Sequence, residues 1–314
     1  MTGSPIQQVM AVFRLAKGLP PSRIYQFAKL QAKRKLVRPK NPVSFYAKWD
    51  YRSRYWAELV KVKGLETELF PEYSKLNSHK LAGAAGVKTC KLLDGPISVD
   101  RLRLDEYGSD FVIKPDWGSS SRGVLLLHRL SQDKYLNLAD GTEMRAKDIA
   151  NKLTEGIKNA SKGRADDLIV EESLINGEKR PIEWKVYTFY GQIGLIMAID
   201  PNVHHGEHYK AKFYSPNWQY LGPDILKDRE IDGSIGLPKH PEMLLEAAKA
   251  ISLQVPTGFM RVDLFEGPEG PMLGEVCLIP GLDQYFRNGY DRKLGQMWED
   301  ANVRLLAERR ALIP

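Results

Sequence analysis

Two long stretches of the sequence alternate apolar and polar residues around short glycine turns, which is the pattern of β-hairpins. One is EWKVYTFYGQIGLIMAID, with its reversal expected at Gly191-Gln192, and the other is FMRVDLFEGPEGPMLGEVC, with GPEGP as the turn. The apolar runs DFVIKP and GVLLLHRL flank the loop WGSSSRG and predict a further strand, loop and strand. Helical patterns at 141–161 and 241–254 lie between the strands. Antiparallel hairpins interspersed with helices favour an α+β fold over a doubly wound parallel sheet.

The region before these hairpins predicts a small α/β module. Ser78 is a candidate N-cap for the helix HKLAGAAG, Gly86 is its expected end, and VKTCKLL reads as a short strand. Prolines at 39 and 42 break any earlier helix. We therefore predict four parts, namely a basic N-terminal arm (1–49), an N-terminal α/β module (50–105) and two α+β lobes (106–172 and 173–314).

Composition allows a globular enzyme and argues against a membrane protein. The chain has 314 residues, of which 43% are apolar, so it can bury a sizeable core. It contains no apolar run of membrane-spanning length and no pattern of a cleaved signal. The two cysteines, Cys90 and Cys277, match no zinc or CxxC spacing. A reducing cytoplasm is the expected location.

The positive charge is concentrated in the arm. Since the whole chain carries +7 and residues 1–49 carry ten basic side chains with no acid, the remainder carries a net −3. Such an arm could contact an anionic membrane surface, a polyanionic substrate or nucleic acid. The alternative is a solvated helix face whose apolar stripe docks on the body. The arm lacks the interleaved aromatic residues of a nucleic-acid stacking platform, which disfavours a specific nucleic-acid partner.

The loop GSSSRG resembles the first half of a Walker A motif but does not complete it. A P-loop requires Lys and Ser/Thr followed by a helix, whereas an apolar strand follows here. The remaining interpretations are a plain β-turn or a glycine- and serine-rich loop whose N–H and hydroxyl groups cover phosphate oxygens, with Lys114 adding a positive charge beneath it. The candidate phosphate-binding residues of the loop are Gly118, Ser119, Ser120, Ser121, Arg122 and Gly123.

A pair of carboxylates in the second hairpin is a candidate metal site. If GPEGP is the turn, Asp263 and Glu275 lie on paired strands and repel unless a cation lies between them. Mg2+ prefers such oxygen ligands together with nucleotide phosphates. The alternative is that both acids face solvent or form ion pairs with Arg261 and other cations.

Two further segments suggest ligand contacts. The strand LIVEESL breaks at Glu171-Glu172, and the chain resumes at Glu183, a pattern that suits a hinge beside a flat base and a ribose. In PNVHHGEHYKAKF the residues His204, His205, His208 and Lys210 are expected in a loop that receives an anionic substrate. A zinc site is disfavoured there because HExxH chemistry requires a helix.

With these pieces in order, the sequence resembles the ATP-grasp superfamily and, within it, the TupA-like ATP-grasp proteins associated with cell-surface polymer biosynthesis. The matching stretches occur in the family's order over roughly residues 75 to 285. They are SHKLAGAAGVKTCKLL, DFVIKPDWGSSSRGVLLL, LIVEESL, EWKVYTFYGQ, YSPNWQYL and RVDLFEGPEGPMLGEVCLIPG. The resemblance implies two α+β lobes that enclose ATP and magnesium.

The resemblance also implies roles for individual residues. Lys80 and Lys114 would reach nucleotide phosphates beneath the lid loop 118–123. Glu171, Glu172 and Leu174 would line the adenine hinge, and Glu183 would meet the ribose. Lys185 and Arg261 would be the catalytic cations, and Asp263 and Glu275 the magnesium ligands. Two departures are Cys277, where many relatives carry Asn, and His79, where relatives often carry Asp.

The predicted activity is an ATP-dependent carboxylate–amine ligase acting on small-molecule or peptide substrates through an acyl phosphate. Two alternatives remain open. One is an ATP-grasp phosphotransferase that leaves the phosphoryl group on a hydroxyl acceptor, and the other is a non-catalytic nucleotide-binding module tethered by its basic arm.

Overall fold

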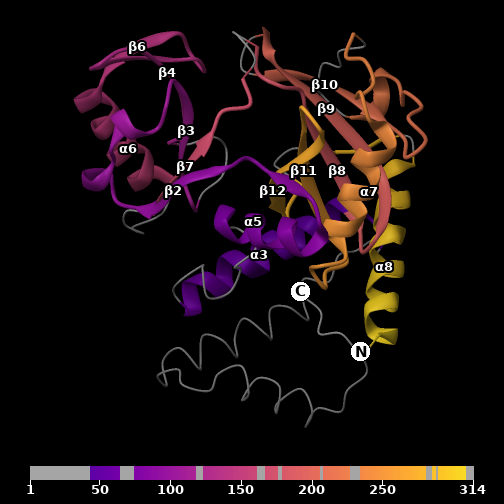
Figure 1. The fold of residues 1–314 in the computed structure, drawn as a ribbon. Coiled ribbons are helices and arrows are strands. Elements are labelled where there is room, and N and C mark those ends of the chain that lie inside the picture. The colour runs from indigo at the N-terminus through magenta and orange to yellow at the C-terminus, as the bar shows by residue number, and fades with distance from the viewer. Residues whose placement is uncertain are drawn as a thin grey trace.

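The computed structural model describes residues 43–63, 74–117, 123–160, 167–175, 179–205, 208–226, 234–280, 285–287 and 289–308. Most of the predicted arm and residues 118–122 of the predicted lid loop lie outside these ranges. No described helix has the length and apolarity needed to cross a membrane. The fold is α+β, as predicted, and contains two six-stranded sheets that lie side by side (Figure 1).

Sheet A contains both predicted hairpins. In spatial order its strands are β1 (Lys88–Thr89), β12 (Gly270–Cys277), β11 (Met260–Gly267), β8 (Glu183–Phe189), β9 (Gln192–His205) and β10 (His208–Tyr214). β1 pairs with β12 in parallel, and the other neighbours pair antiparallel. The β8–β9 hairpin reverses at Tyr190 and Gly191, which have φ angles of 43° and 81°. The reversal lies one residue earlier than predicted, because two successive left-handed residues form a tight primed turn.

Sheet B is antiparallel throughout. Its strands are β2 (Leu92–Ile97), β7 (Leu168–Glu172), β3 (Asp110–Pro115), β4 (Leu125–Ser131), β5 (Lys134–Asn137) and β6 (Thr142–Arg145). Helix α6 (Ala146–Ala160) covers one face (Figure 1). The helix predicted over 141–161 therefore begins later, since residues 142–145 pair with β5. Apolar residues of β3, β4 and β7 alternate toward α6 and form the core of this part of the chain.

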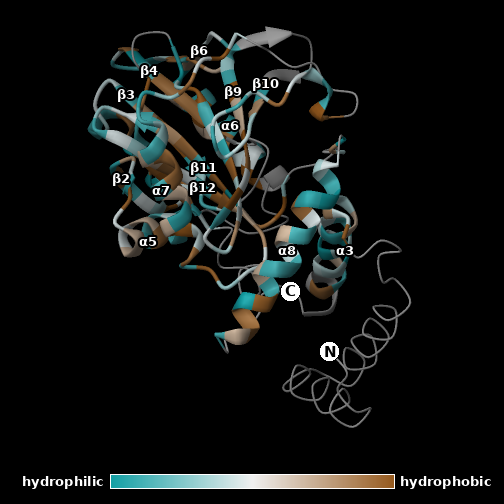
Figure 2. Cartoon of the chain, turned by 90° about the vertical axis from the view of Figure 1, so that its right-hand side faces the viewer, coloured by the Kyte–Doolittle hydropathy of each residue, from teal (hydrophilic) through white to brown (hydrophobic). Residues whose placement is uncertain are grey.

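Helices cover both faces of sheet A. Helix α7 (Pro241–Ser252) and α5 (Lys75–Ala85) pack on the face that carries Trp184 and Val186. Helices α3 (Phe45–Lys63) and α8 (Tyr290–Ala307) pack together against the face that carries Tyr187 and Phe189. Polar residues lie along much of α3 and α8, whereas the strands behind them are mainly apolar (Figure 2). The amphipathic helix predicted at 241–254 is thus present as α7.

The predicted N-terminal module has no sheet of its own. Strand β1 joins sheet A and β2 joins sheet B, although only two residues separate them. The segment therefore connects the two sheets. The four predicted boundaries remain predictions.

Helix α5 begins earlier than predicted, and this changes which side chains face the site. Ser74 is its N-cap, because its Oγ accepts from Asn77 N at 3.1 Å, whereas Ser78 lies inside the helix. Ser74 Oγ also donates to Asp116 Oδ2 at 2.8 Å, and Leu76 N donates to Asp116 Oδ1 at 2.8 Å. The first turn is thereby attached to the end of β3. The predicted end at Gly86 is confirmed, with the left-handed φ of 68° that favours glycine.

Replacing each of these two serines by alanine tests the assignment of Ser74 as the cap. We expect Ser74→Ala to lower the free energy of unfolding by about 2 kcal/mol, because it removes a cap and a hydrogen bond to a buried carboxylate. Ser78→Ala should change it by no more than about 0.5 kcal/mol, since Ser78 Oγ donates to the Ser74 carbonyl four residues earlier, a bond that adds little to helix stability. Urea denaturation of the two variants measures both values, and equal effects would contradict the assignment of Ser74.

Candidate functional site

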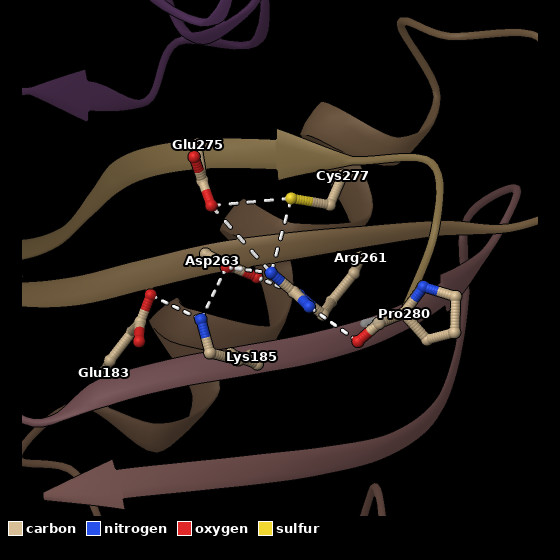
Figure 3. Close-up of polar contacts among 7 residues, drawn as sticks. All are labelled: Glu183, Lys185, Arg261, Asp263, Glu275, Cys277 and Pro280. Atoms are coloured by element: carbon tan, nitrogen blue, oxygen red, sulfur yellow. Dashed lines mark hydrogen bonds and ion pairs between the residues drawn. The ribbon is translucent and has the colours of Figure 1, made fainter. Parts of the chain in front are cut away.

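The register of sheet A brings four polar side chains to one face. Asp263 lies opposite Glu275, and Arg261 lies opposite Cys277, on the paired strands β11 and β12. Directly opposed residues of an antiparallel pair share a face. Their neighbours Val262 and Val276 belong to the core under α7, so the four polar residues point to the other side (Figure 3). The prediction that the two acids lie on paired strands is confirmed.

Asp263 is the centre of this group. Its side chain is fully buried, and its carboxylate accepts from Arg261 Nε and Nη2, each at 2.6 Å, and from Lys185 Nζ at 2.8 Å. Burial alone would raise the pKa of Asp263, but the Arg261 guanidinium and the Lys185 ammonium outweigh it and hold the pKa below its ordinary value. Asp263 is therefore an ionised, fully hydrogen-bonded carboxylate.

Lys185 links Asp263 to a second acid. It lies opposite Asp263 in the register of β8 and β11, and its Nζ is 2.5 Å from Glu183 Oε1. Burial would lower the pKa of Lys185, but Asp263 and Glu183 outweigh it, and the net pKa is raised. For Glu183, burial and the nearby Asp263 raise the pKa in spite of Lys185. Two acids thus share one ammonium group.

Arg261 extends the network to the end of β12. Its Nη1 donates to the Pro280 carbonyl at 2.6 Å, and its Nη2 lies 3.3 Å from Cys277 Sγ and 3.9 Å from Glu275 Oε1 (Figure 3). Burial lowers the pKa of Arg261 less than Asp263 raises it, so the guanidinium stays charged. One guanidinium therefore lies beside all three potential metal ligands of this face.

The donor atoms of Asp263, Glu275 and Cys277 lie within 4.8 Å of one another. The two carboxylates suit Mg2+, a hard cation that prefers oxygen ligands. The thiol does not, because sulfur is a soft donor and burial raises the pKa of Cys277 well above its ordinary value. The residues present therefore fit a Mg2+ ion held by two carboxylates, with its remaining positions left to phosphate and water.

A second charged group lies on sheet B, on the face opposite α6. Lys114 Nζ is 2.5 Å from Glu171 Oε2, and His79 Nε2 is 2.7 Å from Glu171 Oε1. Thr89 Oγ1 is 3.0 Å from the other ring nitrogen of His79. Burial would raise the pKa of Glu171, but Lys114 and His79 outweigh it and lower the pKa. The Glu171 side chain thus holds a lysine and a histidine, while Glu172 is exposed and Leu174 is half-buried beyond the strand.

Lys75 interacts electrostatically with both groups and was missed by the sequence analysis. It is buried at the first turn of α5, and its Nζ lies 3.4 Å from the Asp116 carbonyl. Burial lowers the pKa of Lys75, and Lys114 lowers it further, while Glu275 and Asp116 raise it. Its electrostatic neighbours therefore come from both sheets. The predicted phosphate ligand Lys80 is exposed instead.

Helix geometry explains the difference between the two lysines. Residues 75 and 79 are four apart and share a face, whereas residue 80 points away from them. A cap at Ser78 would place Lys80 in the first turn, whereas the cap at Ser74 places Lys75 there. The role of Lys80 was implied by the family resemblance, which does not determine the helix start.

Several predicted ligand residues, or their side chains, lie outside the part of the chain that the structure describes. Residues 118–122 are not described, and neither are the side chains of His204, His205, His208 and Lys210. The backbone at 203–205 and 208–210 belongs to β9 and β10, which corrects the expected loop to a strand pair. Gly123 has a φ of 73°, and a Cβ there would lie 3.0 Å from Pro115, so this end of the predicted lid requires glycine.

The half-buried thiol of Cys90, between β1 and β2, gives a test of the electrostatics beside Glu171. Burial, together with Glu171, raises the pKa of Cys90 from 9.0 to about 11. At pH 8 only about one thiol in a thousand is then ionised, compared with about one in ten ordinarily. We expect its reaction with a disulfide reagent at pH 8 to be about a hundredfold slower than that of a free thiol. Rapid labelling of Cys90 in the native protein at pH 8 would contradict this environment.

Part of the chain matches a known protein family, and solved structures resemble it. Residues 94–299 match the family described as TupA-like ATPgrasp. No curated protein matches the sequence. Among solved structures, a D-alanine–D-alanine ligase from Bacillus anthracis is similar with 20% identity, over 76% of this chain and 69% of that one, at a TM-score of 0.47. D-cycloserine synthetase DcsG is similar with 16% identity, over 80% of each chain, at a TM-score of 0.43. The ATP-grasp ligase PsnB, in complex with its minimal precursor, is similar with 13% identity, over 81% of this chain and 70% of that one, at a TM-score of 0.41.

Proposed function

Because this chain belongs to the TupA-like ATP-grasp family, we propose that it is an ATP-dependent ligase that joins a carboxylate to an amine. The observation that carries the proposal is the network of buried ion pairs around Asp263, together with Lys75, whose electrostatic neighbours include Glu275 of sheet A and Lys114 of sheet B. Lys114 comes from sheet B, Lys185 and Arg261 from sheet A, and Lys75 interacts electrostatically with groups of both. Two cations beside the two acids, with Lys75 and Lys114 as further cations, suit a triphosphate with its metal ion.

Asp263 and Glu275 would hold Mg2+, which supplies positive charge opposite the transferred phosphoryl oxygens. Asp263 is ionised and buried, so it can act without a change of protonation. The Glu275 side chain is 35% exposed and lies opposite Asp263 on the neighbouring strand. Lys75 and Lys114 would bind phosphate oxygens, and Glu183 would accept from the ribose hydroxyls.

In the proposed reaction, an oxygen of the substrate carboxylate attacks the γ-phosphorus of ATP, and the bond to the β–γ bridging oxygen breaks to release ADP. The amine then attacks the carbonyl carbon of the acyl phosphate, loses a proton and expels inorganic phosphate. Negative charge develops on the phosphoryl oxygens and later on the carbonyl oxygen. Arg261 and Lys185 are held by Asp263 and would stabilise that charge by preorganised electrostatics.

The substrates we propose are a small-molecule or peptide carboxylate and an amine. The residues that would receive the anionic substrate are His204, His205, His208 and Lys210, which belong to the paired strands β9 and β10. We place the reaction in the cytoplasm, because the two cysteines match no disulfide framework. The basic arm would add a peripheral contact with an anionic surface.

Product analysis tests the ligase against its alternatives. The protein is incubated with ATP, Mg2+ and paired pools of carboxylates and amines, and ADP, phosphate and new masses are followed. We expect ADP and free phosphate to appear in equal amounts with a condensation product. Phosphate retained on an acceptor would establish a phosphotransferase instead. Nucleotide binding without turnover in any pool would leave a binding module and refute the ligase.

A further inference from the structure

Arg52 is a buried arginine of α3 that reaches the hairpin of the candidate site. It is 3% exposed, and its Nη1 donates to two carbonyls, Phe259 O at 3.0 Å and Leu278 O at 2.9 Å. Its Nη2 donates to Thr257 Oγ1 at 3.1 Å, and that hydroxyl donates to Phe259 O at 3.2 Å. One side chain thus binds three groups that lie more than two hundred positions away in the sequence.

The two carbonyls lie at the open end of the hairpin. Phe259 immediately precedes β11, and Leu278 immediately follows β12. The strand pairing ends at the opposed residues Arg261 and Cys277. Arg52 therefore connects the strands just beyond the last backbone pair. These strands are the ones that carry Asp263 and Glu275.

A second path leads from Arg52 to Arg261. The Leu278 carbonyl held by Arg52 is two residues before Pro280, whose own carbonyl accepts from Arg261 Nη1 at 2.6 Å. Arg261 in turn holds Asp263 through two hydrogen bonds. A displacement of the segment after β12 would therefore reach the guanidinium and then the carboxylate.

The surroundings of Arg52 select a guanidinium. Its Cζ lies 4.2 Å from the ring centre of Trp298 and 5.3 Å from that of Trp56, both of which are buried. A planar cation stacks on such rings and donates in several fixed directions at once. A lysine ammonium has the charge but cannot reproduce this fork.

We propose that Arg52 is a positioning residue that fixes the spacing and aim of the metal-binding carboxylates and of Arg261. The inference rests on the proposed function for the identity of the ligand, Mg2+ with a nucleotide. It does not require the ligation chemistry, because it concerns the binding step. Arg52 acts through the hairpin and touches no substrate.

Magnesium-dependent nucleotide binding tests the proposal. The Mg2+ concentration for half-maximal binding of a non-hydrolysable ATP analogue is measured for the full chain and for Arg52→Lys, with folding followed by circular dichroism. We expect this midpoint to rise about tenfold in Arg52→Lys, as for the loss of a residue that orients metal ligands. An irreversible loss of folded protein alone would lower the amplitude and leave the midpoint unchanged, and circular dichroism shows whether the variant is fully folded. Arg54→Lys is the matched control, since Arg54 is an exposed arginine of the same helix paired with Asp50.

Two further measurements test the positioning role of Arg52 independently of Arg52→Lys. Thr257→Val removes one anchor of Arg52 without removing its charge, and we expect a smaller rise of the midpoint in the same direction. In Arg52→Ala, added ethylguanidine should lower the raised midpoint, whereas ethylamine should not. A folded Arg52→Lys or Thr257→Val protein with the wild-type midpoint overturns the positioning role. Failure of the wild-type chain to bind the analogue with Mg2+ would instead refute the proposed function.

Discussion

Asp263→Asn is expected to abolish most of the activity and to destabilise the fold at the same time. The substitution keeps the shape of the side chain but removes the charge that holds Arg261 and Lys185. Both cations are buried, and removing one partner of a buried ion pair costs about 3–5 kcal/mol. Loss of a metal ligand and of the group that aims Arg261 should also lower the rate by at least about a hundredfold.

Glu275→Gln separates the two effects. The Glu275 side chain is 35% exposed, and Arg261 Nη2 lies 3.9 Å from Glu275 Oε1. We therefore expect Glu275→Gln to unfold at nearly the wild-type urea concentration while losing activity to a similar extent. Phosphate release at saturating ATP and urea denaturation provide the two readouts. An Asp263→Asn protein with wild-type turnover would refute the proposed metal site.

The hairpins and their acids could be predicted because they depend on local sequence. Alternation over β8, β9, β11 and β12 fixes which residues face each side, and a glycine turn fixes the register. The turn at GPEGP places both acids on paired strands, but its register alone would set Asp263 opposite Gly274, and a register shift between Asp263 and Leu264 brings Asp263 opposite Glu275. The β8–β9 reversal deviates by one residue, whereas β9 continues five residues beyond the predicted hairpin, from Asp200 to His205.

The place of Lys75 beside groups of both sheets could not be predicted, because it depends on contacts that are distant in sequence. Ser74 is recognisable as a cap only with Asp116, which lies 42 positions later and also accepts from Leu76 N. Without that contact, Ser78 is an equally good candidate, and the helix face shifts with it. Arg52 is similarly hidden, since its carbonyl acceptors lie 207 and 226 positions away.

Glu171 illustrates how a local pattern identifies a residue but not its contacts. The break after LIVEE marked it as a candidate ligand of a base. In the structure its carboxylate is buried between Lys114 and His79, so the side chain orients two other groups. Its ionisation follows from these partners, and no sequence pattern around Glu171 contains them.

Lys75→Met is expected to remove most of the activity without destabilising the protein. Lys75 is the buried cation whose electrostatic neighbours come from both sheets, and loss of one such cation typically lowers a phosphoryl-transfer rate by about a hundredfold. Burial lowers the pKa of Lys75, which means that the fold disfavours its charge in spite of Glu275 and Asp116. Methionine has a similar shape and no charge, so the free energy of unfolding at pH 7 should stay equal or increase.

The pH dependence of stability gives a second readout that does not rely on activity. Because the folded-state pKa of Lys75 lies below its ordinary value of 10.5, the unfolded chain binds more protons between these two values. The stability of the wild-type protein should therefore rise relative to Lys75→Met as the pH increases through that window. Lys80→Met is the matched control, since Lys80 is exposed on the same helix, and its kcat/KM should stay within about twofold of the wild-type value. If Lys80→Met lost activity and Lys75→Met kept it, the phosphates would contact the outer face of α5, and the arrangement of cations proposed for the two sheets would be wrong.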